Sequence, residues 1–364
     1  MRSRKHSEVM TETVLVFPAG TPDALKYRSE AVERGHRVVG ASSLAWNPEA
    51  GRYDSWEYLP YVHDPDFAEA LRRLIVRLGV TAIYSPHEVV SAHLAEVLPE
   101  ISTKVGLISV SPLLAKERAY RALWDRAAEI SAAPDWFGGG APRLAGPRLA
   151  GLLRFVDDVP GMSDNDKIAA MIEVARHVPA GDIVEIGSWW GRSAALLALL
   201  SRHHDLGPVL CIDPWRAEAL AQGVAMLDKA SAAMNLDDAL TIFETNLAPL
   251  ADGRINYLRA TSTVAAESYC PGLTVETEVL GRTVYTGRIA LLHIDGNHSL
   301  ERVTEDVENW TPHMAPGGWV VFDDYVWAFG DGPRIVGDAW CARHADRIAR
   351  SFVMGTALFV QLEP

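Results

Sequence analysis

Five short apolar runs between residues 182 and 324 limit what this chain can fold into. They are separated by stretches with helical spacing, and they read DIVEIG (182–187), PVLCIDPW (208–215), INYLRA (255–260), RIALLHID (288–295) and GWVVFDD (318–324). Continuous apolar runs that alternate with helices are typical of buried parallel strands. We therefore expect an α/β fold here, with a hairpin inserted at residues 274–287 and a final antiparallel pair of strands in residues 349–363.

The first part of the chain shows the same alternation. Three further runs read as strands with helical stretches between them: TVLVFPAG (13–20), HRVVGAS (36–42) and VTAIYSPHE (80–88). This βαβαβ pattern predicts a smaller Rossmann-like α/β domain over residues 1–112. A predicted helix and a segment rich in Gly, Pro and Ala follow, so residues 113–155 are expected to be a linker. The second domain is then expected to span residues 156–364.

The composition indicates which binding partners and which cellular compartment are expected for this protein. The 364 residues carry a formal net charge of −13, which argues against a general nucleic-acid or anionic-membrane binder. The three cysteines, Cys211, Cys270 and Cys341, are far apart and form no CxxC pair, so neither a disulfide framework nor a thiolate zinc site is expected. The sequence has no signal-peptide pattern and no run of about 18 apolar residues. A cytoplasmic protein without a membrane span is the expectation.

A glycine-containing turn follows the first apolar run of the second domain. Gly187 and Gly191 would allow a sharp turn and the close approach of a ligand at the carboxyl end of a strand. Trp189 and Trp190 occupy the middle of the turn and disfavour a dinucleotide site, and an ordinary strand-to-helix turn is the alternative. Asp213 ends the next run, where a carboxylate can accept hydrogen bonds from ribose hydroxyls or cap a helix.

Acidic residues end two of the later runs. Asp295 ends one, with His298 three residues further on, and Asp323 and Asp324 end the next. If these strands pair in parallel, their tips lie about 4.8 Å apart and three carboxylates gather at one sheet edge. A hard divalent cation such as magnesium, calcium or manganese would relieve their repulsion. Taken singly, each acid could instead belong to a turn or a helix cap.

Four segments together resemble class I S-adenosylmethionine-dependent methyltransferases. They are EIGSWWGRS, IDPW, IDGNHSLERVTEDVENW and APGGWVVFDDY. More narrowly, they are similar to methyltransferase family 24 and to the metal-dependent group that includes macrolide-sugar O-methyltransferases. The resemblance covers roughly residue 161 to the C-terminus. It implies a class I methyltransferase Rossmann-like sheet, with S-adenosyl-L-methionine and Mg²⁺ or another hard divalent cation as cofactors.

The resemblance also implies roles for individual residues. Those expected at the cofactor are Glu185, Gly187, Ser188, Gly191, Ser193, Asp213, Ser262 and Asp295. Those expected at the metal are Asp295, Asp323 and Asp324, and His298 is the expected general base. Relatives that use an aspartate as base carry it at the position of Asn297, which cannot act in that way. The residues considered for the acceptor wall are Tyr325, Trp327 and Arg334, with packing of an irregular loop as the alternative.

The first domain resembles the small Rossmann-like domain that precedes the ATP-grasp fold in carboxylate–amine ligases. No ATP-grasp body follows it, so ligase activity is not expected. Substrate binding, an oligomer interface and a vestigial nucleotide site all stay open. Pro18, Gly20 and Thr21 could shape a ligand loop there, although a simple turn is the favoured interpretation.

These observations predict an S-adenosylmethionine- and magnesium-dependent O-methyltransferase. Its expected acceptor is a hydroxyl of a small metabolite, a natural-product sugar or glycoside, with no nucleic-acid or membrane partner and with homo-oligomers possible. One alternative is a metal-independent N- or carboxyl-methyltransferase. Others are a non-catalytic cofactor-binding or scaffold protein, and a two-headed enzyme that binds ATP in its first domain.

Overall fold

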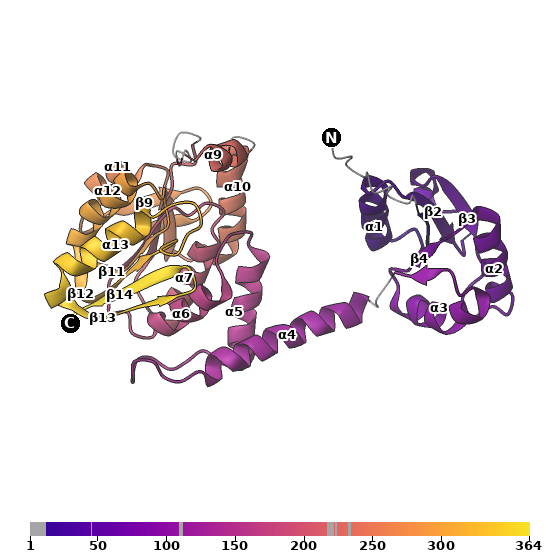
Figure 1. Ribbon diagram of the computed structural model, residues 1–364, viewed down its shortest axis with the longest axis horizontal. Helices are drawn as coiled ribbons and strands as arrows, with labels where there is room; N and C mark the ends of the chain where they lie inside the picture. Colours follow the sequence, from indigo (N-terminus) through magenta and orange to yellow (C-terminus); the bar gives the residue numbers. More distant parts are fainter. Residues whose placement is uncertain (1–11, 45, 109–111, 217–221, 223, 232–233) are drawn as a thin grey trace, which may run out of the picture. The chain divides into compact units, whose positions relative to one another are not determined.

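The structure is a computed structural model that describes residues 12–364 except 45, 109–111, 217–221, 223 and 232–233. The chain divides into two compact units, Met1–Ala122 and Leu123–Pro364, called here the N-terminal and the C-terminal unit (Figure 1). The boundary falls within helix α4 (Pro112–Ala132). Within the described part, no helix combines the length and the apolar character needed to cross a bilayer.

The N-terminal unit contains a five-stranded parallel sheet in the order β3-β2-β1-β4-β5. Its strands are β1 (Thr13–Val16), β2 (Arg37–Ser42), β3 (Ser55–Tyr58), β4 (Ala82–Tyr84) and β5 (Gly106–Leu107). Its helices are α1 (Pro22–Glu33), the 3-10 turn η1 (Pro48–Arg52), α2 (Phe67–Leu78) and α3 (Glu88–Ile101). The predicted Rossmann-like α/β arrangement is confirmed.

Two apolar cores cover the two faces of this small sheet. Leu15 of β1 enters a core with residues of α2 and α3, and its neighbour Val16 enters another with residues of α1. Successive strand residues point to opposite faces, so one short apolar run supplies both cores. The Thr21 hydroxyl accepts a hydrogen bond from Ala24 N at 3.2 Å and caps α1.

The C-terminal unit contains a seven-stranded sheet in the order β13-β14-β12-β11-β6-β7-β8. Its strands are β6 (Asp182–Ile186), β7 (Val209–Ile212), β8 (Ile255–Leu258), β11 (Ile289–Ile294), β12 (Met314–Phe322), β13 (Ile348–Met354) and β14 (Ala357–Leu362). The first five pair in parallel, and β14 is antiparallel to both β12 and β13. The predicted final antiparallel pair is thus confirmed, as is the inserted hairpin of β9 (Thr274–Thr277) and β10 (Gly281–Val284).

Helices cover both faces of this sheet (Figure 1). Those of one core are α5 (Gly146–Asp158), α6 (Asn165–Ala175), α7 (Arg192–His204) and α10 (Leu236–Leu247). Those of the other are α11 (Ser262–Ser268), α12 (Leu300–Trp310) and α13 (Gly332–Arg343), while α9 (Ala225–Ser231) precedes α10. Ile183 and Val184 of β6 enter opposite cores, which is the alternation expected of a strand buried on both faces.

Helix α5 lies where the sequence indicates a linker. Leu149, Leu153 and Val156 on this helix have no exposed surface and belong to a core of the C-terminal unit. Pro147 lies in the first turn of α5, where its missing N–H breaks no helical hydrogen bond. The Gly, Pro and Ala content therefore does not prevent a helix, and the spacing of the leucines gives that helix an apolar face.

Candidate active site

The register of the parallel strands places the ends of four strands side by side. Ile294 of β11 pairs with Ile186 of β6 and Phe322 of β12, and Ile186 pairs with Ile212 of β7. The residues that follow them are, in order across the sheet, Asp213, Gly187, Asp295 and Asp323. Because all four strands run the same way, the structure brings the predicted glycine turn and acidic residues to one carboxyl edge.

The turn after β6 requires glycine at its first position. Gly187 has φ +84°, and a Cβ there would lie 2.0 Å from the carbonyl oxygen of Asp295. Any side chain would collide with the backbone of β11's end, so glycine is what allows the two strand tips to approach. Gly191, with φ +90°, begins α7 from the left-handed region.

Asp213, which follows β7, binds the backbone of this turn through its carboxylate. Its two carboxylate oxygens accept hydrogen bonds from the backbone N–H groups of Trp189, at 3.0 Å, and Trp215, at 2.7 Å. The indole Nε1–H of Trp215 returns a hydrogen bond to Trp189 O at 2.9 Å. Burial raises the pKa of Asp213, against the backbone donors that lower it. Asp213 thus orders the loop in which a ligand would lie.

Other residues predicted at the cofactor lie deeper in the unit. Glu185 has no exposed surface, and its Oε1 lies within hydrogen-bonding distance, 3.2 Å, of His293 Nδ1. Ser188 and Ser193 are also buried. Ser262 begins α11, and its hydroxyl accepts a hydrogen bond from the indole N–H of Trp310 at 2.8 Å, so it is engaged with α12.

Two carboxylates converge on one imidazole at the tips of β11 and β12. His298 Nε2 lies 3.3 Å from Asp324 Oδ2 and 3.9 Å from Asp295 Oδ1. The left-handed backbone of Asp324, φ +48°, turns the chain directly after Asp323. Side chains of Asp295 and Asp324 keep 25% and 24% of their surface exposed, so both are reachable from outside.

The charges of this cluster shift one another's protonation. Burial and the nearby carboxylate of Asp323 raise the pKa of Asp295 to about 7. Burial opposes the charged form of His298, but Asp295 and Asp324 outweigh it and raise the pKa of His298 above its ordinary value. A cluster of neighbouring acids and a histidine whose pKa values are shifted from their ordinary values is typical of a functional site.

Asp323 also belongs to a buried network with Lys167 and His293. Its Oδ2 accepts a hydrogen bond from the Lys167 ammonium and lies 3.3 Å from His293 Nε2. Burial opposes the ionised carboxylate, yet Lys167 and His293 hold the pKa of Asp323 well below its usual range. Burial likewise disfavours the charged imidazole, while Asp323 and Glu185 raise the pKa of His293 to about 10. His293 is thus a buried histidine of β11 with two acidic partners.

Three residues of this region have no sequence motif that would reveal them. Lys167 comes from α6, three residues after the Asp164 cap. Thr356 approaches from the β13–β14 turn, and its hydroxyl lies 3.3 Å from Asp323 Oδ1. The side chain of Gln222 accepts a hydrogen bond from the backbone N–H of His298 at 3.0 Å. None of the three could be found from local sequence patterns.

The residues considered for the acceptor wall separate in the structure. The Trp327 ring meets the His298 imidazole edge-on, with centroids 4.5 Å apart and planes at 80°. The Tyr325 hydroxyl instead donates to Asp338 Oδ1 of α13 at 2.7 Å. Arg334 is exposed and pairs with Asp331 at 2.9 Å. Trp327 is the member of this set that contacts the predicted base.

The donor set fits a hard cation. Asp295 belongs to two groups of possible metal ligands. One group also contains His293 and Asp323, and the other contains His298 and Asp324. Within each group the possible ligand atoms lie within 4.8 Å of one another. Carboxylate oxygens are the ligands that magnesium, calcium and manganese prefer. Burial and, after it, the carboxylate of Asp323 raise the pKa of Asp295, and a cation would favour its ionised form.

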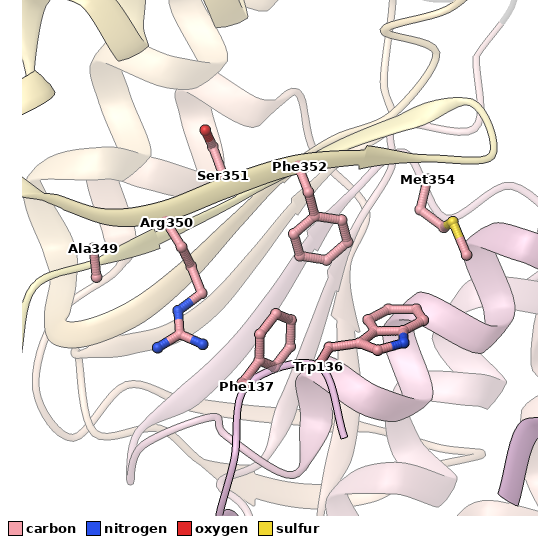
Figure 2. A pocket seen from close by; sticks show the side chains of 7 residues that line it. All are labelled: Trp136, Phe137, Ala349, Arg350, Ser351, Phe352 and Met354. Carbon is pink, nitrogen blue, oxygen red and sulfur yellow. The ribbon is translucent and has the colours of Figure 1, made fainter. Parts of the chain in front are cut away.

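A groove of about 600 Å³ lies elsewhere on the C-terminal unit, along β13 (Figure 2). Rings of Trp136, Phe137 and Phe352 line it, and the Arg350 guanidinium lies 4.8 Å from the centroid of the Phe137 ring. Its other lining residues are Ala349, Ser351 and Met354. It holds no pair of acid and base, so the carboxylate cluster is the better candidate for chemistry.

The strand order, the glycine turn and the acidic strand tips agree with the class I methyltransferase-like sheet that the resemblance implies. Residues 184–325 match the family described as "Methyltransferase domain", which confirms the predicted resemblance over this part of the chain. The matched segment contains the glycine turn, Asp213, the cluster of Asp295 and His298, and the acidic pair after β12.

Individual proteins are similar to the chain over part of its length. The 8-demethyl-8-(2,3-dimethoxy-alpha-L-rhamnosyl)-tetracenomycin-C 4'-O-methyltransferase of Streptomyces olivaceus is 32% identical over 165 residues, which is 45% of this chain. The aligned part spans 59% of that relative. Among solved structures, the O-methyltransferase NovP matches with 16% identity and a TM-score of 0.43, over 68% of this chain and 99% of NovP. CalS11, a TDP-rhamnose 3'-O-methyltransferase, matches with 14% identity and a TM-score of 0.37, over 70% and 96% of the two chains.

Proposed function

We propose that this protein is an S-adenosylmethionine-dependent O-methyltransferase that acts on a hydroxyl of a natural-product sugar or glycoside. The observation that carries the proposal is the single sheet edge at which the glycine turn, Asp213, Asp295, His298 and Asp324 meet. The methyltransferase-domain match supports the reaction class. The name of the Streptomyces olivaceus relative, which methylates a rhamnosyl hydroxyl, supports the class of acceptor.

The cofactor is expected against the turn between β6 and α7. Gly187 and Gly191 carry no side chain at the two ends of this turn, and Asp213 beside it can accept hydrogen bonds from ribose hydroxyls. Ser188 in this turn, Ser193 at the start of α7 and Glu185 near the end of β6 are all buried. When bound, S-adenosylmethionine supplies an electrophilic methyl group.

His298 is proposed as the general base. Its Nε2 faces Asp295 and Asp324, so this nitrogen would take the proton from an acceptor hydroxyl placed between them. The neighbouring Trp327 ring packs against the imidazole in a T-shaped contact and restrains its orientation. Gln222 holds the backbone of the same residue.

The acidic cluster is proposed to hold Mg²⁺ or another hard divalent cation. Asp295 and Asp324 present reachable carboxylates, and Asp323 lies beneath them. When bound, the cation would lower the pKa of an acceptor hydroxyl. A neighbouring hydroxyl or ether oxygen of a sugar would give the acceptor a second point of attachment.

The test is transfer of a labelled methyl group from S-adenosylmethionine to a panel of rhamnosylated aromatic polyketides. We expect transfer to one sugar hydroxyl, loss of transfer after removal of metal with EDTA, and recovery with Mg²⁺. Unchanged transfer by well-stripped enzyme would remove the metal from the proposal. Transfer only to amines or carboxylates would favour the metal-independent alternative, and absence of S-adenosylhomocysteine binding would favour a non-catalytic protein.

A further inference from the structure

The two edge strands of the seven-stranded sheet differ in what lies beside them. At one edge, the hairpin of β9 and β10 packs against β8, and the Asn256 side chain of β8 donates hydrogen bonds to Val275 O, at 3.1 Å, and Gly281 O, at 2.8 Å. At the other edge, β13 pairs with β14 and with no other strand of the described part of the chain. A sheet edge without cover offers its backbone N–H and C=O groups to another strand.

The outer side of β13 is open to such pairing. Among the described residues, no backbone–backbone hydrogen bond joins residues 349–354 to anything except β14. The strand is seven residues long and contains no proline, and its one irregularity, between Ile348 and Arg350, lies at its beginning. Ser351 and Val353 are exposed, the latter at 45%. From Arg350 onward, β13 therefore lacks the features that usually keep an edge strand from pairing.

The charge of β13 differs from that of the whole chain. The net charge of −13 makes two copies of the chain repel each other in general. β13 contains no acid, and its one charged side chain is Arg350. Figure 2 shows Arg350 and Phe352 pointing to the same side of the strand, toward Trp136 and Phe137, while Ser351 points away. This edge is thus a place where two acidic molecules can approach without bringing carboxylates together.

β13 can pair with a second copy of itself in a register that is favourable to both. A two-fold axis perpendicular to the sheet makes the two strands antiparallel and keeps both aromatic grooves on one face. With Ser351 of each copy at the axis, all seven residues of the strand are matched, and Arg350 of each copy lies opposite Phe352 of the other. A guanidinium beside an aromatic ring is an attractive pair.

The neighbouring registers are less favourable. The same symmetry allows shifts only in steps that move the axis by a whole residue. An axis at Arg350 would set two guanidinium groups directly opposite each other, which is destabilising. An axis at Phe352 would leave Ile348 and Ala349 without opposite residues.

We propose that two copies of this chain associate edge to edge through β13, antiparallel and with Ser351 at the two-fold axis. The two seven-stranded sheets then continue into each other. The groove of each copy, with its rings of Trp136, Phe137 and Phe352, lies beside Arg350 of the other copy. Aromatic residues and arginine are enriched at interfaces between proteins. The proposal does not depend on the proposed methyl transfer.

The first test is site-directed crosslinking of the full-length protein. Cys270→Ser with Cys341→Ser removes the two thiols that are not buried and gives the background. Side chains directly opposite each other in an antiparallel pair have Cβ atoms about 4.5–5.5 Å apart. Ser351→Cys in this background should therefore give a covalent dimer as the main product with the short thiol crosslinker dibromobimane. Val353→Cys is the matched control, because two copies of residue 353 would lie about 13 Å apart in this register and should crosslink little.

The second test measures the dimer dissociation constant by sedimentation velocity. Ser351→Asp sets two carboxylates opposite each other at the axis, so it should weaken the dimer by about tenfold or more. Ser351→Asn has the same size without the charge and should leave the dissociation constant near that of the wild type. High salt should restore part of the association of Ser351→Asp. Because Ser351 is exposed, both variants should fold, which circular dichroism checks.

Three outcomes would overturn the proposal. A wild type that sediments as a monomer and a Ser351→Cys variant that does not crosslink would leave the groove to another occupant, such as a small aromatic ligand. A dimer that is equally stable in Ser351→Asp and Ser351→Asn would place the interface elsewhere. Equal crosslinking of Val353→Cys and Ser351→Cys would refute the register. Methyl transfer by the wild type is measured separately, so the failure of the proposed function is distinguishable from each of these.

Discussion

At the scale of single residues, His298 is held by contacts on three sides. Gln222 binds its backbone, Trp327 meets its ring edge-on, and Asp324 lies 3.3 Å from Nε2. An imidazole restrained in this way is oriented toward one point, where a proton can be received. Orientation of this kind separates a base in a site from a histidine that only fills space.

Replacement of His298 by Ala should remove the base and leave the cofactor site intact. We expect turnover to fall by about 10²-fold to 10⁴-fold, the usual contribution of general base catalysis. Calorimetry should show unchanged S-adenosylhomocysteine binding, because the glycine turn is untouched. His203→Ala, at the exposed end of α7, is the matched control and should keep full activity. Retained turnover in His298→Ala would assign the base role to another group.

The pKa of His298 also gives the direction of the pH dependence. A base acts in its neutral form, so kcat/KM should rise as pH increases through the pKa of His298. Asp295 and Asp324 raise that pKa, so the rise should lie above the ordinary histidine value of about 6.5. A rate that falls over the same range would contradict a neutral histidine base.

Gly187 allows a residue-scale test of the close approach between two strands. Gly187→Ala combines a strained φ of +84° with a Cβ 2.0 Å from Asp295 O. Gly272→Ala has a similar φ of +82° and nothing within 4 Å, so it measures the backbone strain alone. We expect Gly272→Ala to destabilise the protein by about 1–2 kcal/mol in urea unfolding. Gly187→Ala should cost clearly more and weaken S-adenosylhomocysteine binding, and equal effects of the two substitutions would refute the steric argument.

At the scale of elements, helix α5 shows how local composition and tertiary packing can disagree. Its Gly and Pro residues indicate a loop, but Leu153 and its apolar neighbours are buried against α7 and the sheet. Leu153→Ala should therefore destabilise the C-terminal unit by about 2–5 kcal/mol. Leu300→Ala, at the 51% exposed start of α12, is the control and should change little. A neutral Leu153→Ala in urea unfolding would restore the linker interpretation.

The strands and the edge where they end follow from the sequence, because both depend on local patterns. Each apolar run needs only its own length and its polar end to be recognised, and parallel pairing then gathers Asp295 and Asp323. The Lys167–Asp323 pair joins residues 156 positions apart. Nothing local distinguishes Lys167 from a solvent-facing lysine on α6. Its partner is decided by how α6 packs on the sheet, which one sequence does not specify.

For the same reason, the sequence does not show that the aspartates at the strand ends have different surroundings in the fold. Asp323 and Asp324 are neighbours in sequence, yet one is enclosed by Lys167 and His293 and the other faces His298. The left-handed turn at Asp324 produces this difference. Composition and spacing predict an acidic site, but the backbone geometry determines how far each acid is exposed.

At the scale of the whole molecule, the chain contains two compact units with separate cores. The glycine turn, the acidic cluster and the matched methyltransferase segment all belong to the C-terminal unit. The N-terminal unit has a sheet and two cores of its own. Units with separate cores are expected to unfold as separate cooperative transitions.

Differential scanning calorimetry of the full-length protein should then show two transitions. S-adenosylhomocysteine binds only the folded C-terminal unit under the proposed function, so it should raise one transition temperature and leave the other unchanged. At a ligand concentration of about 100 times Kd, linkage stabilises the binding unit by about 2.7 kcal/mol. Leu153→Ala should lower that same transition, which assigns it independently of the ligand. A single transition that moves as a whole with ligand would mean that the two units unfold together, and would give the N-terminal unit a direct part in the stability of the site.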